Sequence, residues 1–467
     1  MRNSHSDALV FFGATGDLAY KKIFPSLQAM VKRGHLNVPV VGVAKAGWNL
    51  DQLRARAKDS LEKHGGLDPA AFEKLIGLLD YVDGDYQDAA TFTALRKALK
   101  QAHRPSHYLA IPPVLFETVV GHLSESNCGR GARVIVEKPF GHDLGSAQEL
   151  NKFLLSVFDE EDIFRIDHYL GKRAVDNVMA FRFANTFVEA FWNRTYIKSV
   201  EITMAEDFGV QGRGGFYDQT GTIRDVVQNH LFQVMSNLAM EPAARFDSES
   251  MRDEKVKVLK AIAPIEENNL VRGQFRGYRE ENGVAKNSQT ETFAALKLEV
   301  NSWRWKGVPF YIRAGKNLPA TVTEVVGKFR KPPSLLPDSV LTENHLRLRL
   351  SPEIKIAMGM MTLSPSAEGI ALQESEMVAS HSPRADEMDA YERVLGAAMA
   401  GDSSLFARED YVEEAWRIVE PVLKANTPIY QYEPGTWGPD EVERVTPAGG
   451  WTNPAGKKAL AVASEAA

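Results

Sequence analysis

Eight consecutive residues, RIDHYLGK at Arg165–Lys172, contain four ionisable side chains and a phenol. Apolar residues and a glycine interrupt the polar groups, so the stretch does not have the pattern of a solvated charge run. His168, Tyr169 and Lys172 supply an imidazole, a phenol and an ammonium group, which all donate hydrogen bonds to anions. The stretch therefore indicates either a polar surface turn or the wall of a pocket that holds an anion.

A glycine-rich turn, GATGDLA, follows the first apolar run of the chain. Gly13, Gly16 and Ala19 have the spacing G-x-x-G-x-x-A between a strand-like and a helix-like segment. Such a turn lets the backbone approach a pyrophosphate at a helix N-terminus, although small residues also make ordinary tight turns. The turn is thus a candidate dinucleotide site.

The choice of dinucleotide depends on the next strand-like run, VPVVGVAK, which ends at Lys45. A site that prefers NAD usually has an acid there, and neither Lys45 nor the following Ala46 and Gly47 offers a carboxylate. A lysine at this position attracts a 2′-phosphate, which favours NADP and leaves NAD as the weaker alternative. Lys45 is also compatible with a solvated strand end.

The composition limits the class of protein. With 467 residues the chain is too long for one small core, so two large domains are expected. A net charge of −6 argues against a general nucleic-acid binder. The single cysteine, Cys128, fits a reducing compartment, and the run ALVFF is too short for a signal peptide or a membrane span. These features predict a cytoplasmic protein with no nucleic-acid or membrane partner, and no metal site is predicted.

Strand-like and helix-like segments alternate in the first part of the chain. The expected strands are ALVFF, VPVVGVAK, SHYLAIPP and ARVIVEKPF; the expected helices are the Ile23, Leu27, Met30 and Val31 repeat, closed by Gly34, and Val114–Ser124. This alternation predicts βαβ units on a parallel sheet, an α/β Rossmann-like dinucleotide-binding domain over residues 1–170.

The later half has strands with one covered face. SVEITMAE, TFAALKLEV, HLRLRLSP and IKIAMGM alternate apolar with polar residues. They predict an α+β C-terminal domain, residues 171–467, with a large, mostly antiparallel sheet. RIDHYLGK falls at this boundary, and clefts between domains are favoured ligand sites.

Together these motifs resemble the glucose-6-phosphate dehydrogenase family, from about Ala8 to Val445. The matching stretches are GATGDLAYKK, EKPFG, RIDHYLGK, FRFAN, GRGGFYDQTGTIRDVVQNHLFQ, RDEKVKVL, GVPFYIRAGK and DAYERVLGAAMAGDSSLF. The resemblance implies oxidation of the C1 hydroxyl of D-glucose 6-phosphate to 6-phosphoglucono-1,5-lactone, the first step of the oxidative pentose phosphate pathway, with hydride passed to NADP. It also implies a homodimer or homotetramer joined through the sheet of the second domain, whose role is substrate binding and dimerisation.

Oxidation of an alcohol needs a base for the hydroxyl proton, and histidine suits this role because its ordinary pKa is about 6.5. On its helix-like segment His230 also fits a core position, since Val226, Val227 and Val234 share its face. The resemblance implies that His230 is the proton acceptor. It implies that Asp167 is the carboxylate that fixes the tautomer of the imidazole.

The remaining site residues also follow from the resemblance. The implied substrate-binding residues are His168, Tyr169 and Lys172 for the phosphate, Glu206 and Asp225 for sugar hydroxyls, and Lys138 and Lys316. The implied cofactor-binding residues are Gly13, Thr15, Gly16, Asp17, Leu18, Lys45 and Lys138, with Lys138 between the sugar and the nicotinamide. Lys138 and Lys316 also fit solvated strand ends.

Asp225 has a second interpretation, because Thr222 three positions earlier makes a pattern like a capping box. On an ideal α-helix, five residues separate Asp225 from His230 by about 140°. Both side chains then serve one pocket only if the sugar wraps the helix end.

Three positions depart from the family pattern. Thr321 stands where a second basic residue is usual, and Arg173 and Asp176 stand where Glu and Gln are usual. These departures concern the preference for the phosphorylated sugar. Two alternatives to the enzyme stay open. One is a related hexose or hexose-phosphate dehydrogenase that uses NAD, and the other is a non-catalytic sensor that binds NADP or a sugar phosphate.

Overall fold

The computed structural model describes residues 5–333, 341–365, 371–381 and 386–455. The chain forms two compact units. Unit 1 contains Met1–Arg173, Ala243–Asp253 and Asp386–Glu413, and unit 2 contains Ala174–Pro242, Glu254–Ala385 and Glu414–Ala467. Two later segments thus belong to unit 1, whereas the domain limits predicted from sequence, 1–170 and 171–467, assigned them to the second domain. The division into functional domains stays a prediction.

The sheet of unit 1 has seven strands among the described residues, in the order β15-β6-β5-β4-β1-β2-β3. Their bounds are β1 Ala8–Phe12, β2 Val40–Ala44, β3 Leu79–Asp83, β4 Pro105–Leu109, β5 Arg133–Glu137, β6 Ile163–Ile166 and β15 Phe406–Ala407. All neighbouring strands run parallel except the β15–β6 pair. The predicted α/β domain with a parallel sheet is confirmed.

Helices connect these strands. They are α1 Phe24–Lys32, α2 Leu50–Lys63, α3 Pro69–Leu78, α4 Ala89–Ala98, α5 Phe116–Glu125, α6 Leu144–Leu155 and α12 Ala390–Ala400. The apolar repeat predicted from its helical spacing is buried: Ile23 ends the π-helix η1 Ala19–Ile23, and Leu27, Met30 and Val31 lie on α1. The chain turns after α1 at Gly34, whose φ is 77°, which is a conformation that glycine adopts without strain.

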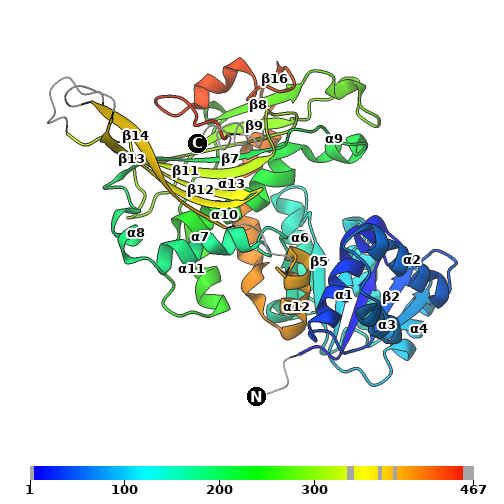
Figure 1. The fold of residues 1–467 in the computed structure, drawn as a ribbon. Helices are drawn as coiled ribbons and strands as arrows, with labels where there is room; N and C mark the ends of the chain where they lie inside the picture. The colour runs from blue at the N-terminus through cyan, green and yellow to red at the C-terminus, as the bar shows by residue number, and fades with distance from the viewer. Residues whose placement is uncertain (1–4, 334–340, 366–370, 382–385, 456–467) are drawn as a thin grey trace. The chain divides into compact units, whose positions relative to one another are not determined.

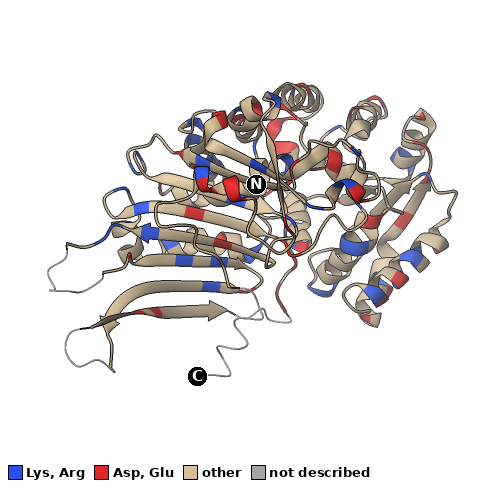
Figure 2. Cartoon of the chain, turned by 90° about the horizontal axis from the view of Figure 1, so that it is seen from above, with Lys and Arg blue, Asp and Glu red and all other residues tan. Residues whose placement is uncertain are grey.

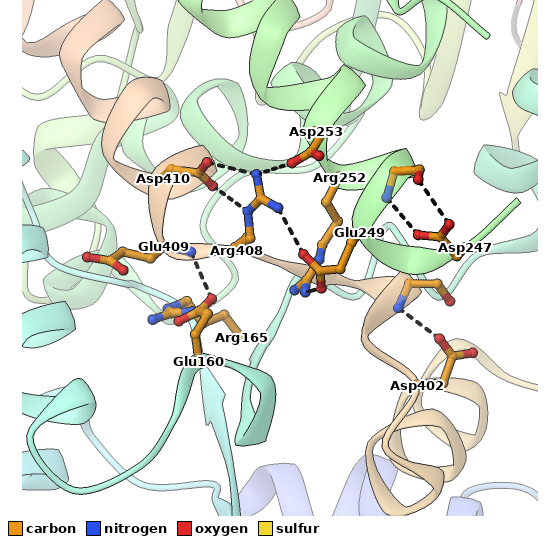
Figure 3. Close-up of polar contacts among 12 residues, drawn as sticks. Glu160, Arg165, Asp247, Glu249, Arg252, Asp253, Asp402, Arg408, Glu409 and Asp410 are labelled. Carbon is orange, nitrogen blue, oxygen red and sulfur yellow. Dashed lines mark hydrogen bonds and ion pairs between the residues drawn. The ribbon is translucent and has the colours of Figure 1, made fainter. Parts of the chain in front are cut away.

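The two later segments are tied to unit 1 by an ion network around Arg408 (Figure 3). Its guanidinium forms a two-bond contact with Asp410, at 2.9 Å each, and reaches Glu249 at 2.9 Å and Asp253 at 2.6 Å. Glu160 accepts the backbone N–H of Glu409 at 3.0 Å. Residues far apart in the sequence therefore meet in one polar cluster of unit 1.

The sheet of unit 2 has nine strands among the described residues, in the order β14-β13-β12-β11-β7-β10-β9-β8-β16. Their bounds are β7 Ile197–Ala205, β8 Leu270–Phe275, β9 Phe293–Glu299, β10 Pro309–Gly315, β11 Val322–Phe329, β12 His345–Ser351, β13 Ile354–Leu363, β14 Leu372–His381 and β16 Ile429–Tyr432. Only β10–β7 and β16–β8 pair in parallel. The predicted large, mostly antiparallel sheet is confirmed.

Helices accompany this sheet, and α7, α8 and α10 lie along one side of it in Figure 1. The helices are α7 Arg173–Phe183, α8 Thr186–Phe191, α9 Gly214–Thr222, the π-helix η4 Ile223–Leu231, α10 Phe232–Ala239, α11 Ser248–Lys260 and α13 Glu409–Lys424. Within the described ranges, no helix is both long and apolar enough to cross a membrane. Basic and acidic residues are interspersed along the elements of each unit, as Figure 2 shows.

Candidate active site

The RIDHYLGK stretch forms a compact turn between β6 and α7. Consecutive backbone bonds close it, from Leu170 N–H to Asp167 C=O at 2.9 Å and from Lys172 N–H to Tyr169 C=O at 3.0 Å. The Asp167 side chain is only 3% exposed, and its Oδ1 accepts the N–H of Tyr169 at 2.9 Å. The turn therefore holds a buried carboxylate beside the polar groups that follow it.

The side chains of this turn contact one another. Lys172 Nζ lies 3.6 Å from the centroid of the Tyr169 ring, a cation–π contact. The His168 ring meets the Tyr169 ring at 5.4 Å and lies nearly parallel to Tyr391 at 6.2 Å. The structure thus brings the three predicted phosphate ligands together in unit 1. Tyr391 was not predicted, although it stands in the quoted stretch DAYERVLGAAMAGDSSLF.

A half-buried carboxyl group, Glu137, ends β5 immediately before Lys138. Tyr108 Oη donates to Glu137 Oε1 at 2.5 Å. Burial raises the pKa of Glu137 to about 7, although the Tyr108 bond and the charge of Lys138 lower it. Burial and then the charge of Glu137 also raise the pKa of Tyr391. Glu137 was not predicted from the sequence, because a single carboxylate at the end of a strand-like run carries no functional signal of its own.

The glycine turn has the shape that a dinucleotide site needs. Gly13 has a φ of 78°, and a Cβ added to it would lie 2.2 Å from the carbonyl oxygen of Ala110. The N–H of Gly16 donates to the carbonyl of Gly13 at 2.9 Å, and helical structure begins at Asp17. Backbone and helix terminus lie at the carboxyl edge of the parallel sheet, where a pyrophosphate binds in such folds. These residues, with Thr15 between them and Leu18 after them, fit a nicotinamide dinucleotide.

Two acidic residues, Asp83 and Asp85, lie near the end of β2 and Lys45. Lys45 Nζ forms an ion pair with Asp85 Oδ2 at 2.6 Å, and its hydrogen bond to Asp85 raises the pKa of Lys45. Asp83 lies opposite Ala44 in the parallel register. The acidic groups come from β3 and the turn after it, so they are distant from Lys45 in sequence. Lys45, Ala46 and Gly47 themselves offer no carboxylate, as expected from the sequence, but the strand pairing brings Asp83 and Asp85 close to Lys45.

His230 lies in unit 2 on η4, a π-helix, and is 2% exposed. Hydrogen bonds from residue i to i+5 in a π-helix place residues five apart in successive turns on one side. Asp225 is five positions before His230 and lies on the same π-helix. The separation of about 140° expected for an α-helix therefore does not apply, and both side chains can serve one pocket.

Asp225 lies in the first turn of η4, as expected for a helix-start residue, but Thr222 at the N-cap makes no side-chain capping bond. Thr222 Oγ1 instead lies 2.9 Å from Tyr217 Oη and donates to the carbonyl of Glu291 at 3.3 Å. The backbone breaks at Gly221, with a φ of 69°, just before η4 begins. The hydroxyl of Thr222 thus holds this break against the segment just before β9.

Glu206 and Lys316 form an ion pair in unit 2, with Lys316 Nζ 2.5 Å from Glu206 Oε2. They follow the ends of β7 and β10, which pair in parallel. Lys316 Nζ also lies 4.9 Å from the centroid of the Tyr217 ring. Glu206 was predicted as an acceptor for sugar hydroxyls and Lys316 as a substrate lysine. The structure joins these two residues in one ion pair.

The three departures occupy different places. Thr321 Oγ1 donates to Asp207 Oδ1 and accepts the N–H of Asp207 at 3.0 Å, next to Glu206. Arg173 is exposed at the start of α7, and Asp176 lies in its first turn. Thr321 thus has a local role in holding the loop that carries Glu206.

Two family models match the chain and together span most of it. They are "Glucose-6-phosphate dehydrogenase, NAD binding domain" at residues 10–177 and "Glucose-6-phosphate dehydrogenase, C-terminal domain" at residues 179–452. A curated Mycobacterium tuberculosis protein named glucose-6-phosphate 1-dehydrogenase 1 is 43% identical over 455 residues, which cover 96% of this chain and 97% of the relative. Glucose-6-phosphate 1-dehydrogenase 6, cytoplasmic, of Arabidopsis thaliana is 36% identical, with 95% and 91% covered.

Solved structures give the same result. The crystal structure of glucose-6-phosphate 1-dehydrogenase from Mycobacterium avium has a TM-score of 0.90 and 42% identity, covering 97% of this chain and 99% of that one. A glucose-6-phosphate dehydrogenase in complex with its substrate glucose 6-phosphate has a TM-score of 0.88 and 36% identity, with the same coverage. Sequence and fold are thus similar to these proteins over both units.

Proposed function

The chain belongs to the glucose-6-phosphate dehydrogenase family, and we propose that it oxidises the C1 hydroxyl of D-glucose 6-phosphate to 6-phosphoglucono-1,5-lactone with hydride transfer to NADP. It is an oxidoreductase with a nicotinamide-dinucleotide-binding domain. A cytoplasmic location, which the composition predicts, and a homodimer or homotetramer, which the resemblance implies, belong to the same proposal.

The observation that carries the proposal is the turn after β6. It gathers the imidazole of His168, the phenol of Tyr169 and the ammonium group of Lys172 within one turn of chain. A phosphate monoester takes charge-assisted hydrogen bonds from such donors. We assign these three side chains to the phosphate of the substrate.

The remaining roles concern the reacting end of the sugar. His230 takes the proton of the C1 hydroxyl, and Asp167 keeps the imidazole in the required tautomer. Glu206 and Asp225 accept hydrogen bonds from sugar hydroxyls, because a carboxylate accepts several at once. Lys138 and Lys316 contact the substrate. The nicotinamide of a bound dinucleotide would accept the hydride, and residues Gly13 to Leu18 would hold the pyrophosphate of the dinucleotide.

The proposal is tested by crossing two sugars with two cofactors in one assay of nicotinamide reduction. Glucose 6-phosphate with NADP is expected to give the highest specificity constant. Faster turnover of free glucose, or of NAD, would favour the related hexose dehydrogenase. Binding of NADP without turnover of either sugar would favour the sensor.

Lys172→Ala is expected to raise KM for glucose 6-phosphate about 10- to 100-fold, because the ammonium group is a counter-ion only for the phosphorylated sugar. KM for free glucose should change less than threefold. Steady-state kinetics with both sugars measure this difference. Lys257→Ala is the matched control, because it removes an exposed lysine from α11. Equal effects of Lys172→Ala on the two sugars would show that Lys172 does not face the phosphate.

Lys45→Ala is expected to lower kcat/KM for NADP about tenfold or more, because a 2′-phosphate loses its positively charged partner. The value for NAD should stay within threefold of the parent. Kinetics with both cofactors at saturating glucose 6-phosphate measure the ratio. Lys63→Ala provides the control, since Lys63 is an exposed lysine of unit 1 in a comparable ion pair with Asp59. A parent that already used NAD better than NADP would contradict this role of Lys45.

A further inference from the structure

The ends of β2 and β3 emerge side by side in unit 1. The strands pair in parallel, with Ala44 opposite Asp83, so the residues after both strands lie at the same edge of the sheet. In open parallel sheets, dinucleotides bind outside this carboxyl edge. The acidic residues of the segment after β3 therefore share the surroundings of Lys45.

Asp83 shapes the loop that follows Lys45. Its Oδ1 accepts the backbone N–H groups of Ala46, Gly47 and Trp48 at 3.0, 2.9 and 3.3 Å, and the hydroxyl of Tyr81 at 2.8 Å. Successive N–H groups of this kind form an anion-binding concavity. The protein fills this one with its own carboxylate, so these three donors are engaged before any phosphate arrives.

Asp85 is fixed independently of Lys45. Its Oδ1 accepts the N–H of Gln87 at 3.0 Å, and its carbonyl oxygen accepts the hydroxyl of Thr91 at 2.7 Å. Its other carboxylate oxygen, Oδ2, accepts from Lys45 Nζ at 2.6 Å. The turn before α4 thus holds a negative charge against the lysine.

This lysine is also the group proposed to bind the 2′-phosphate. The Asp85 carboxylate already accepts a hydrogen bond from the Lys45 ammonium group. A phosphate that approaches Lys45 is therefore repelled by the negative charge of Asp85. The side chains of the pair are 71% and 39% exposed, and exposed ion pairs are weak and easily displaced. An incoming 2′-phosphate can therefore displace Asp85, at a loss in affinity.

We propose that Asp85 is a specificity-determining residue for the cofactor, because it competes with the 2′-phosphate of NADP for Lys45. The competition lowers the affinity for NADP and so reduces the difference in affinity between NADP and NAD. NAD has no 2′-phosphate and leaves the Lys45–Asp85 pair intact. The inference rests on the proposed dinucleotide site, but not on the identity of the sugar.

The test measures equilibrium binding to the full-length protein by calorimetry, without turnover. Adenosine 2′,5′-bisphosphate and adenosine 5′-monophosphate are suitable probes, because they differ only in the 2′-phosphate. Asp85→Asn should bind the bisphosphate about three- to tenfold more tightly than the parent, as expected for removal of an exposed competing charge. Its affinity for the monophosphate should change less than twofold. Asn retains an acceptor for the N–H of Gln87, and Asp85→Ser is a second variant that also retains one.

A double-mutant cycle makes the mechanism specific. In a Lys45→Ala background, Asp85→Asn should improve bisphosphate binding by less than half of its effect in the parent, because the shared lysine is absent. Asp83→Asn is the control for loop structure and should weaken both probes together. The inference is overturned if Asp85→Asn and Asp85→Ser leave the bisphosphate affinity unchanged, or raise both affinities equally.

Failure of the proposed dinucleotide site or of the proposed reaction would give different results from failure of the inference about Asp85. A parent that bound neither probe would overturn the inference together with the dinucleotide site. A parent that bound both probes but did not oxidise glucose 6-phosphate would overturn only the proposed reaction, and the effect of Asp85→Asn on the bisphosphate would still decide the inference.

Discussion

His230→Asn is expected to lower kcat about 10²- to 10⁴-fold, the usual range for loss of a general base. The amide of Asn can hydrogen-bond to the sugar hydroxyl but cannot take its proton, so binding is preserved and the chemical step is slowed. Steady-state kinetics give kcat, and calorimetry gives the dissociation constant for glucose 6-phosphate. That constant should stay within threefold of the parent value.

A buried histidine outside the site provides the control for this variant. His107 is fully buried in β4, and its Nε2 lies 2.8 Å from the carbonyl oxygen of Cys128. His107→Asn should reduce stability, measured as Tm, while folded protein keeps the parent kcat. If kcat of His230→Asn stayed within threefold of the parent, His230 would not be the base.

The fold of unit 1 is readable from sequence because its central strands are buried on both faces. β1 and β2 are continuous apolar runs, and β4 and β5 are buried along nearly all of their length, with helices or turns between the strands, which is the signature of a parallel sheet. β3 was not predicted, because it lies at the sheet edge and LDYVD has only two buried residues. An edge strand gives a weaker hydrophobic signal than a central one.

Unit 2 shows the same limit more strongly. β7, β9 and β12 are largely buried and were predicted from their sequence pattern, as was β13. β14, in contrast, is exposed along most of its length, and LQESEMVASH contains no alternation. Strands such as β14 are defined by backbone pairing with a neighbour, which the local pattern does not encode.

The site was predictable where its residues are neighbours in sequence. The turn at Asp167–Lys172 and the glycine turn are local, so their chemistry is visible in one short stretch. Pairs formed by the sheet are not local: Lys45 and Asp85 are 40 positions apart, and Glu206 and Lys316 are 110 apart. Only the strand register brings these charges together, so the residues next to Lys45 in the sequence do not reveal its acidic partner.

The π-helix around His230 has a related cause. Patterns of apolar residues are interpreted with the α-helical repeat of 3.6 residues, and a π-helix has a longer repeat. The α-helical repeat is correct for most helices, but it gives the wrong angular separation between Asp225 and His230, which lie on a π-helix. π-Helical turns are frequent at functional sites, which agrees with the proposed roles of both residues.

Asp167→Asn is expected to lower kcat about 10- to 1,000-fold, less than the loss for His230→Asn, because a misoriented base still retains some activity. Asn can present a donor where the imidazole needs an acceptor, which favours the wrong tautomer. KM for glucose 6-phosphate should change less than kcat, since Asp167 is not assigned to the phosphate. Steady-state kinetics measure both values. Asp162→Asn, which alters another partly buried carboxyl group of unit 1, should keep the parent kcat.

The decisive comparison is the double variant of Asp167 and His230. The effects of substituting two residues that act as one unit are not additive. Asp167→Asn should therefore lower kcat only slightly further in a His230→Asn background. Multiplication of the two losses would show that Asp167 acts independently of the imidazole, through the turn that it supports by accepting the N–H of Tyr169. In that case KM for glucose 6-phosphate should rise together with the loss of kcat, because the same turn carries the phosphate ligands.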